Sequence, residues 1–195
     1  MKIKLISIGK TDSKQLQILI NDYTKRLNHY IKFSFDTIPD LKKSKKLINI
    51  IDKKKFNKPT FIECNLLDIK KLQKIIKKIV SSKGTIHSLI NNAANDERHT
   101  TEEVDEKYYE NRMAINLKHY FFAAQEVVKG MKKDKNGSIV NLSSVSWMLG
   151  EGDKVIYETA KSAVVGLTRS FAQEYGKYNI RTNSVVPGSI ATERQ

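Results

Sequence analysis

The sequence predicts an α/β protein whose parallel sheet lies between two layers of helices, a three-layer, doubly wound arrangement. Segments with the apolar pattern of strands alternate with segments of helical spacing over most of the 195 residues. Residues 86–90 and 139–142 are rich in apolar side chains, as parallel strands buried on both faces are. The alternation predicts the parallel sheet, and the apolar strands predict helices on both of its faces.

Residues 1–60 predict an atypical, basic strand-helix-strand-helix segment. Residues 2–8 have the pattern of a strand, and Thr11 or Asp12 can cap the helix that follows. Residues 33–38 predict a second strand, and residues 41–55 predict a lysine-rich helix that ends before a proline.

The alternation continues to the end of the chain, and residues 61–195 supply most of the predicted sheet. Strands and helices are expected in turn over residues 60–66, 69–80, 86–91, 101–132, 138–142, 156–175 and 181–186. We expect the two parts of the chain to form one compact unit, because the length suits a single well-buried core.

Polar side chains follow the predicted strands at the edge where an open parallel sheet binds its ligands. They are Asn65, Asn91 and Asn92, Ser143 and Ser144, and Ser189. The functional site is therefore expected at the carboxyl ends of the strands.

The composition excludes several classes of protein. No stretch approaches the roughly 18 apolar residues of a membrane span, and the N-terminus lacks the apolar centre of a signal peptide, so we expect a cytoplasmic protein. Cys64 is the only cysteine, which excludes an internal disulfide, and no cluster of metal ligands is present in the sequence.

The charge is concentrated in the first third of the chain, where 15 Lys and Arg residues stand against 5 acidic residues. Such asymmetry is one mark of a nucleic-acid surface. However, 29 of the 35 basic residues are lysines, and Arg26 is the only arginine among residues 1–60, whereas ordered phosphate sites favour arginine. A solvated lysine surface is therefore favoured over nucleic acid as a partner.

Tyr157 and Lys161 are separated by one helical turn, and this pair alone means little. Eight tyrosines and 29 lysines produce about one such pair by chance. Here, however, the pair opens a helix and projects toward the carboxyl edge of the sheet, and Ser144 lies 13 residues earlier at the end of a buried strand.

These residues belong to an ordered set of motifs. The set is Leu-Ile-Asn-Asn-Ala-Ala at residues 89–94, Asn116 in Ala-Ile-Asn-Leu, Gly-Ser-Ile-Val-Asn-Leu-Ser-Ser at 137–144, Tyr157 with Lys161, and Ile-Arg-Thr-Asn-Ser-Val-Val-Pro-Gly at 180–188. Over residues 61–195 it resembles the short-chain dehydrogenase/reductase family. The resemblance implies a Rossmann-like fold and an oxidoreductase that transfers hydride between a nicotinamide cofactor and a hydroxyl or carbonyl substrate.

The resemblance implies four catalytic residues. Tyr157 is the general acid/base, and the neighbouring Lys161 ammonium is expected to lower its pKa. Ser144 hydrogen-bonds the same substrate oxygen, Lys161 also holds the nicotinamide ribose, and Asn116 binds the water that relays protons.

The resemblance also implies cofactor and substrate contacts. The expected cofactor contacts, with NAD favoured and NADP left open, are Asn65, Leu66, Asn92, Tyr157, Lys161, Ile190 and Thr192. Residues 91–99, 145–148 and 191–195 look most like aldose dehydrogenases of the D-xylose 1-dehydrogenase type, so a sugar is the expected substrate. The expected sugar contacts are Trp147, Asn95 and Gln195, with Asp96 as a further candidate.

Two features depart from this family. Its Gly-rich turn, which brings backbone amides to the pyrophosphate, is replaced at residues 7–12 by a turn with Gly9 alone. The expected sheet is also incomplete at the C-terminal end, which leaves the strand at residues 181–186 as an edge and favours a homo-oligomer.

The first 43 residues resemble a different family, the large-subunit rRNA pseudouridine methyltransferases. The resemblance lies in residues 1–12, in Tyr23, Arg26 and Tyr30, and in residues 33–40. Two alternatives to the oxidoreductase therefore stay open, namely an inactive gene fusion and a basic RNA- or ribosome-associated module.

Overall fold

The computed structural model describes residues 2–8, 25, 32–38 and 60–188. The chain divides into two compact units. The larger unit runs from Glu63 to Ile190, and the smaller one contains the first two strands. Each unit is described by itself, and their union into one compact body stays a prediction.

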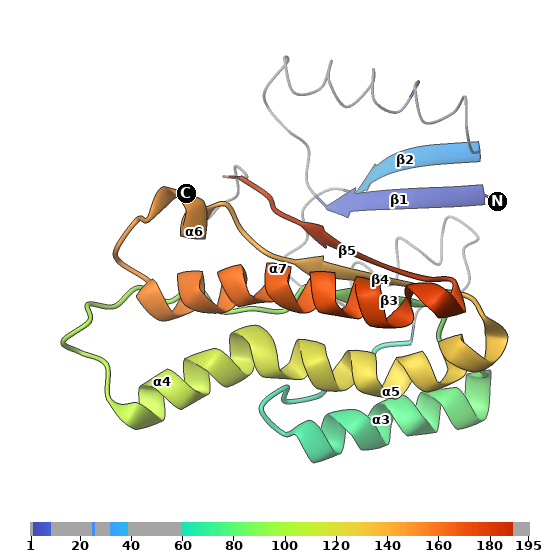
Figure 1. The fold of residues 1–195 in the computed structure, drawn as a ribbon, viewed down its shortest axis with the longest axis horizontal. Helices are drawn as coiled ribbons and strands as arrows, with labels where there is room; N and C mark the ends of the chain where they lie inside the picture. The colour runs from blue at the N-terminus through green and yellow to red at the C-terminus, as the bar shows by residue number, and fades with distance from the viewer. Residues whose placement is uncertain (1, 9–24, 26–31, 39–59, 189–195) are drawn as a thin grey trace. The chain divides into compact units, whose positions relative to one another are not determined.

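The smaller unit contains two parallel strands, β1 (Lys2–Ile8) and β2 (Lys32–Ile38), as predicted (Figure 1). They pair residue by residue, from Lys2 opposite Lys32 to Ile8 opposite Ile38. Of the helix predicted between these strands only Lys25 is described, and it is helical. The helix predicted over residues 41–55 lies outside the described residues.

The larger unit is built on three parallel strands, β3 (Ser88–Asn91), β4 (Gly137–Leu142) and β5 (Ile180–Val185). They lie in the order β3-β4-β5, so each strand pairs with its successor in the sequence. Parallel neighbours need a crossover connection, which the helices between them provide. The predicted α/β fold with a parallel sheet is therefore confirmed.

Helices cover one face of this sheet in Figure 1. They are α3 (Ile69–Lys83), α4 (Glu106–Met113), α5 (His119–Asp134) and α7 (Val155–Tyr175). The short helix α6 (Ser146–Leu149) follows β4. The second layer of helices, on the other face of the sheet, stays a prediction.

Local sequence signals fix the ends of these helices. Asp68 caps α3, because its carboxylate accepts the N–H of Lys71 at 2.9 Å. The helix ends at Gly84, whose φ of 88° a residue with a side chain rarely adopts. Asp105 caps α4 in the same way, through the N–H of Tyr108.

The core lies between the sheet and helices α3, α5 and α7. Its buried members are Leu72, Ile76, Ala123, Ala124, Val127, Val128, Met131, Ile139, Phe171, Tyr175 and Ile180. Because α5 contributes five of them, packs on α3 and the sheet, and contacts α7 through Phe121 and Phe171, it is the central helix of the larger unit.

Two predicted elements differ from the structure. The strand expected over residues 60–66 is not formed, since this segment has no ladder partner among the described residues and Phe61 is 67% exposed. The single helix expected over residues 101–132 begins only at Glu106 and contains a π-helical turn, Ala114–Lys118, between α4 and α5. Among the described residues, no helix is long and apolar enough to cross a membrane.

Candidate active site

The expected catalytic residues Ser144, Tyr157 and Lys161 meet at the carboxyl end of β4. Ser143 ties this end to its neighbours, because its N–H donates to Val185 O at 2.8 Å and its hydroxyl donates to Lys161 O at 2.7 Å. These two bonds fix the end of β4 against β5 and against α7.

Lys161 is buried, with 1% of its surface exposed, and its ammonium has specific partners. The Nζ donates to Leu142 O at 2.6 Å and to the Tyr120 hydroxyl at 3.2 Å, and this hydroxyl donates to Leu142 O at 3.2 Å. Burial disfavours the charged form and lowers the pKa of Lys161 to about 8. Lys161 therefore loses its proton at a lower pH than an exposed lysine does.

Tyr157 lies one helical turn before Lys161 and is half-buried. The Lys161 Nζ lies 5.6 Å from the centroid of its ring, and the Ser144 hydroxyl is near enough to favour the charged form of its phenol. The expected lowering of the Tyr157 pKa is wrong for this structure. Burial raises that pKa and outweighs the opposing effect of the Ser144 hydroxyl, while the Lys161 ammonium is directed at Leu142 and Tyr120.

Ser144 is oriented by the turn that follows β4. Its Oγ accepts from Ser146 N at 3.2 Å and from the Ser146 hydroxyl at 3.0 Å. A hydroxyl that accepts twice still has its own hydrogen to donate. Ser144 is thus set to donate toward the phenol of Tyr157 or toward an oxygen beside it.

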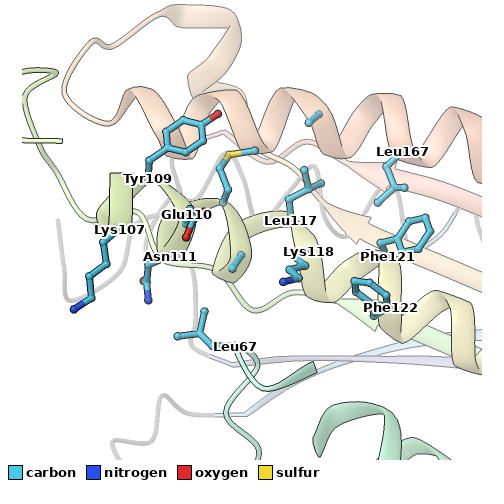
Figure 2. A pocket seen from close by; sticks show the side chains of 13 residues that line it. Leu67, Lys107, Tyr109, Glu110, Asn111, Leu117, Lys118, Phe121, Phe122 and Leu167 are labelled. Atoms are coloured by element: carbon cyan, nitrogen blue, oxygen red, sulfur yellow. The ribbon is translucent and has the colours of Figure 1, made fainter. Parts of the chain in front are cut away.

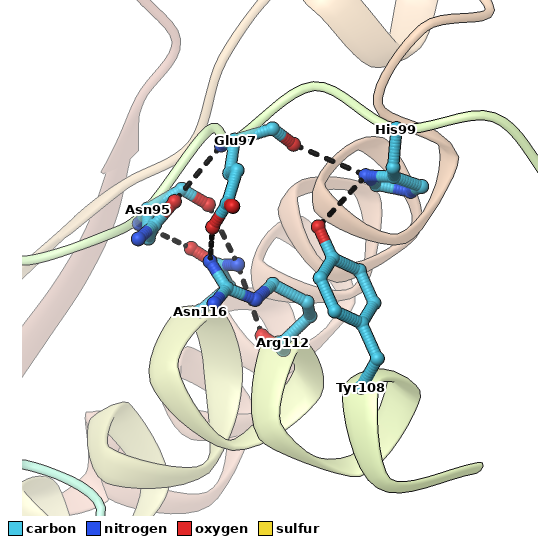
Figure 3. Close-up of polar contacts among 6 residues, drawn as sticks. All are labelled: Asn95, Glu97, His99, Tyr108, Arg112 and Asn116. Carbon is cyan, nitrogen blue, oxygen red and sulfur yellow. Dashed lines mark hydrogen bonds and ion pairs between the residues drawn. The ribbon is translucent and has the colours of Figure 1, made fainter. Parts of the chain in front are cut away.

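Asn116 is fully buried in the π-helical turn and anchors the loop that follows β3. Its Oδ1 accepts from Asn95 N at 2.8 Å, and its Nδ2 donates to Asn95 O at 3.0 Å and to Arg112 O at 2.9 Å (Figure 3). The side chain therefore holds the loop backbone, and π-helical turns of this kind occur frequently at functional sites.

An ion pair between Arg112 and Glu97 also holds the loop that follows β3. Arg112 contacts the carboxylate of Glu97 at 2.7 Å, and the side-chain oxygen of Asn95 accepts the N–H of Glu97 at 2.9 Å (Figure 3). Asn95, an expected sugar contact, is thus fixed on three sides by its backbone and side-chain bonds.

The structure describes some of the expected cofactor and substrate residues. Asn92 is exposed beyond the end of β3, and Leu66 is half-buried before α3. Asn65 is exposed, and its Oδ1 accepts the N–H of Leu67 at 3.1 Å in a tight turn. Trp147 lies in α6, where its indole N–H is buried with no hydrogen-bond partner among the described residues. The other three, Ile190, Thr192 and Gln195, lie outside the described residues.

Sequence reasoning missed two buried side chains beside Lys161. Tyr120 is fully buried and bonds the Lys161 ammonium, and its own burial raises its pKa. His119 packs edge-on against Tyr120 at 4.6 Å, and burial lowers the pKa of His119 to about 4. Helical spacing could have indicated Tyr120, because it follows Asn116 by four residues and so lies on the same face of the predicted helix.

Two protein families match this chain. Residues 39–195 match the family described as short chain dehydrogenase. Residues 1–76 match the predicted SPOUT methyltransferases, in agreement with the methyltransferase resemblance of the first residues.

Proteins named as sugar dehydrogenases are among the relatives. A D-xylose 1-dehydrogenase of Caulobacter vibrioides is 40% identical over 137 residues, which are 70% of this chain and 54% of that protein. A probable galactose dehydrogenase of Rhizobium meliloti is 39% identical over the same shares of both chains. The chain thus spans about half the length of these relatives.

A solved structure supports the fold. A putative short-chain dehydrogenase/reductase of Burkholderia xenovorans has a TM-score of 0.72 with this chain at 23% identity, over 98% of this chain and 75% of the other. Since the short chain dehydrogenase match covers residues 39–195, well over half of the sequence, the chain belongs to the short-chain dehydrogenase/reductase family.

Proposed function

We propose that this chain is an oxidoreductase that transfers hydride between NAD and a hydroxyl or carbonyl group of an aldose. The observation that carries the proposal is the position of Ser144, Tyr157 and Lys161 at the carboxyl end of β4, where the buried Lys161 ammonium lies 5.6 Å from the centroid of the Tyr157 ring. The relatives, a D-xylose 1-dehydrogenase and a probable galactose dehydrogenase, favour a sugar substrate.

Each catalytic residue has a role that its surroundings allow. The Tyr157 hydroxyl gives or takes the proton of the substrate oxygen, and Ser144 donates a hydrogen bond to that same oxygen. A raised pKa keeps the phenol protonated, which suits proton donation in the reducing direction. Asn116 contributes by fixing the loop that carries Asn95.

The described residues fit the nicotinamide half of a cofactor. Two of the three N–H groups of the Lys161 ammonium have partners among the described residues, which leaves one for a ribose hydroxyl. Lys161 and Tyr157 would hold this ribose, and Asn92, Asn65 and Leu66 would contact the adenosine half. The bound cofactor supplies the hydride chemistry. NAD is proposed ahead of NADP.

The test of the proposal uses the full chain with NAD and either D-xylose or D-galactose. Reduction of the cofactor is followed by its absorbance, and binding is followed by nicotinamide fluorescence. Turnover with either sugar supports the proposal. A chain that binds no cofactor and reduces none at high enzyme concentration contradicts it and favours the inactive fusion.

We also propose a homo-oligomer. An open groove of about 980 Å³ lies along α4, the π-helical turn and α5, and Figure 2 shows that its side chains include several aromatic and aliphatic ones. Phe121 and Tyr109 in this groove are 41% and 47% exposed. Apolar surface of this kind favours association with a second copy.

A second candidate function, RNA or ribosome association, is favoured by the match of residues 1–76 to methyltransferases and by the basic charge of residues 1–60. Salt-dependent retention of ribosomal RNA by the full chain tests it, since phosphate contacts weaken as salt rises. Retention that does not change with salt would argue against it.

A further inference from the structure

The helix that carries Tyr157 begins without a cap of its own. Lys154 occupies the N-cap position of α7, and its side chain accepts no hydrogen bond from the helix. The first N–H groups of any α-helix have no partner within the helix, so a cap residue usually accepts one of them. Here the acceptor comes from a distant loop, because His99 Nε2 lies 3.4 Å from the backbone nitrogen of Ile156, the second residue of α7.

His99 is held firmly in this position. It is 8% exposed, its Nδ1 lies 3.1 Å from Glu97 O and 3.3 Å from the Tyr108 hydroxyl, and its ring packs edge-on against Tyr108 at 5.3 Å (Figure 3). Since Nε2 accepts from an amide and Glu97 O can only accept, the proton of the neutral ring lies on Nδ1. This tautomer satisfies the contact of Nε2 with Ile156 and the contact of Nδ1 with Glu97 O.

The same loop is tied to the residues just before α7. The backbone N–H of His99 donates to Asp153 O at 2.8 Å, and Arg98 forms an ion pair with the Asp153 carboxylate. On its other side the loop is tied to the helix α4, through Arg112 and Glu97. The start of α7 is thus fastened to α4 by way of residues 97–99.

We propose that His99 is a positioning residue that caps α7 from the loop after β3 and thereby fixes Tyr157, the next residue after Ile156. The capping role stands on the hydrogen bonds alone, and its consequence for turnover rests on the proposed function. His99 needs no contact with substrate or cofactor for this role.

The cap matters for Tyr157 more than for the rest of the helix. Tyr157 lies in the first turn, where helices fray, whereas Lys161 lies one turn further on and is bonded to Leu142 O at 2.6 Å. Loss of the cap would therefore displace the phenol relative to both Lys161 and Ser144, while the lysine stays in place.

Two substitutions of His99 separate the cap from the other contacts. In His99→Gln the side-chain oxygen reaches the position of Nε2 and can accept from Ile156. In His99→Asn the shorter amide reaches the position of Nδ1 and can donate to Glu97 O, but it cannot reach the helix. The matched control is His87→Asn, at an exposed histidine before β3 that pairs with Asp134.

The first measurement is amide hydrogen exchange of the full chain, resolved for the first turn of α7. In His99→Asn we expect the first-turn amides to exchange about fivefold faster, the size of effect that a lost N-cap produces. His99→Gln and His87→Asn should exchange like the parent protein. Unchanged exchange in a folded His99→Asn variant would overturn the proposal, and so would equal losses in the Asn and Gln variants.

The second measurement is turnover. If the parent oxidises an aldose, His99→Asn should lower kcat by between about tenfold and a hundredfold at an unchanged KM for the cofactor, and His99→Gln should restore kcat. An unchanged kcat in a variant with faster exchange would overturn the link to Tyr157. A parent without turnover contradicts the proposed function instead, and the exchange measurement still decides the cap.

Discussion

The ammonium of Lys161 lies 3.2 Å from the hydroxyl oxygen of Tyr120, and both groups bond the carbonyl oxygen of Leu142. This arrangement holds a nearly inaccessible charge at the carboxyl end of β4. A charge buried with few partners costs stability, and such a cost is usual where a group with a shifted pKa serves a function.

Replacing Lys161 should change how stability depends on pH. The pKa of about 8 in the folded chain lies below the ordinary value for lysine of about 10.4, so the unfolded chain binds more protons between these values. The parent should therefore gain stability as the pH rises from about 8 to about 10, and Lys161→Met should lack this gain.

The measurement is the free energy of unfolding in denaturant at several pH values, for the parent and for Lys161→Met. Lys133→Met, at an exposed lysine of α5, is the control for the loss of one positive charge. If the difference between the parent and Lys161→Met stays constant over this window, the lowered pKa of Lys161 is contradicted.

Removal of the Tyr157 hydroxyl should abolish most turnover. General acid/base groups contribute about a hundredfold to ten-thousandfold, so Tyr157→Phe should lower kcat with an aldose and NAD at least a hundredfold. Tyr178→Phe, at a tyrosine after α7, is the control. Equal rates in Tyr157→Phe and the parent would remove this residue from the mechanism.

Truncation of Asn116 to alanine should lower the free energy of unfolding. Asn116→Ala leaves the backbone groups of Asn95 and the carbonyl of Arg112 without their partners, and the loss of three partly buried hydrogen bonds should together cost roughly 2 to 4 kcal/mol. Denaturant unfolding compares this variant with Asn111→Ala, a half-buried asparagine of α4. A loss no larger than that of Asn111→Ala would show that the anchor of the loop contributes little.

The motif residues could be predicted because they follow the strands and open the helix that the apolar pattern of the sequence predicts. Ser144, Tyr157 and Lys161 lie together as their spacing predicts, and β3, β4 and β5 form at the predicted segments within one or two residues. The sequence could not predict which residues that are distant in the chain form hydrogen bonds with each other in the folded protein. The long helix changes to a π-helical turn at Ala114–Lys118, where Asn116 bonds Asn95 in a loop 21 residues earlier.

The direction in which the Tyr157 pKa shifts was likewise not predictable from the sequence. Proximity of Lys161 in sequence predicts a lowered pKa, but the ammonium is engaged by Leu142 and Tyr120, so burial of the phenol decides the direction. Likewise, the apolar pattern of residues 60–66 is that of a strand, yet a strand exists only where a neighbour accepts its hydrogen bonds.

Cofactor affinity should be weak in this chain. Gly9 is the only glycine of residues 7–12, which stand where the family has its Gly-rich turn, and Asp12 adds a negative charge to this part of the sequence, whereas a phosphate site favours positive charge. We expect NAD to bind with a dissociation constant of about 1 mM or weaker, measured by fluorescence titration of the reduced cofactor. Replacing residues 1–60 by the corresponding segment of an aldose dehydrogenase should tighten binding, and micromolar affinity of the unmodified chain would contradict the expectation.

The last prediction concerns association through the groove of Figure 2. Phe121 and Tyr109 are exposed there beside Leu117, Phe122 and Leu167, and burial of these side chains against a second copy would remove apolar surface from water. Sedimentation at micromolar concentration should therefore find an oligomer of the full chain. Phe121→Glu should shift it toward the monomer, because association would bury an unpaired carboxylate.

Met148→Glu is the control for this prediction, since Met148 is 59% exposed on α6 and does not line the groove. It should leave the oligomer intact. Equal dissociation by both variants would mean that added charge alone separates the copies. A parent that sediments as one monomeric species with a cooperative melt would contradict the homo-oligomer, because the exposed aromatic side chains of α4 and α5 would then be stable in water without a partner.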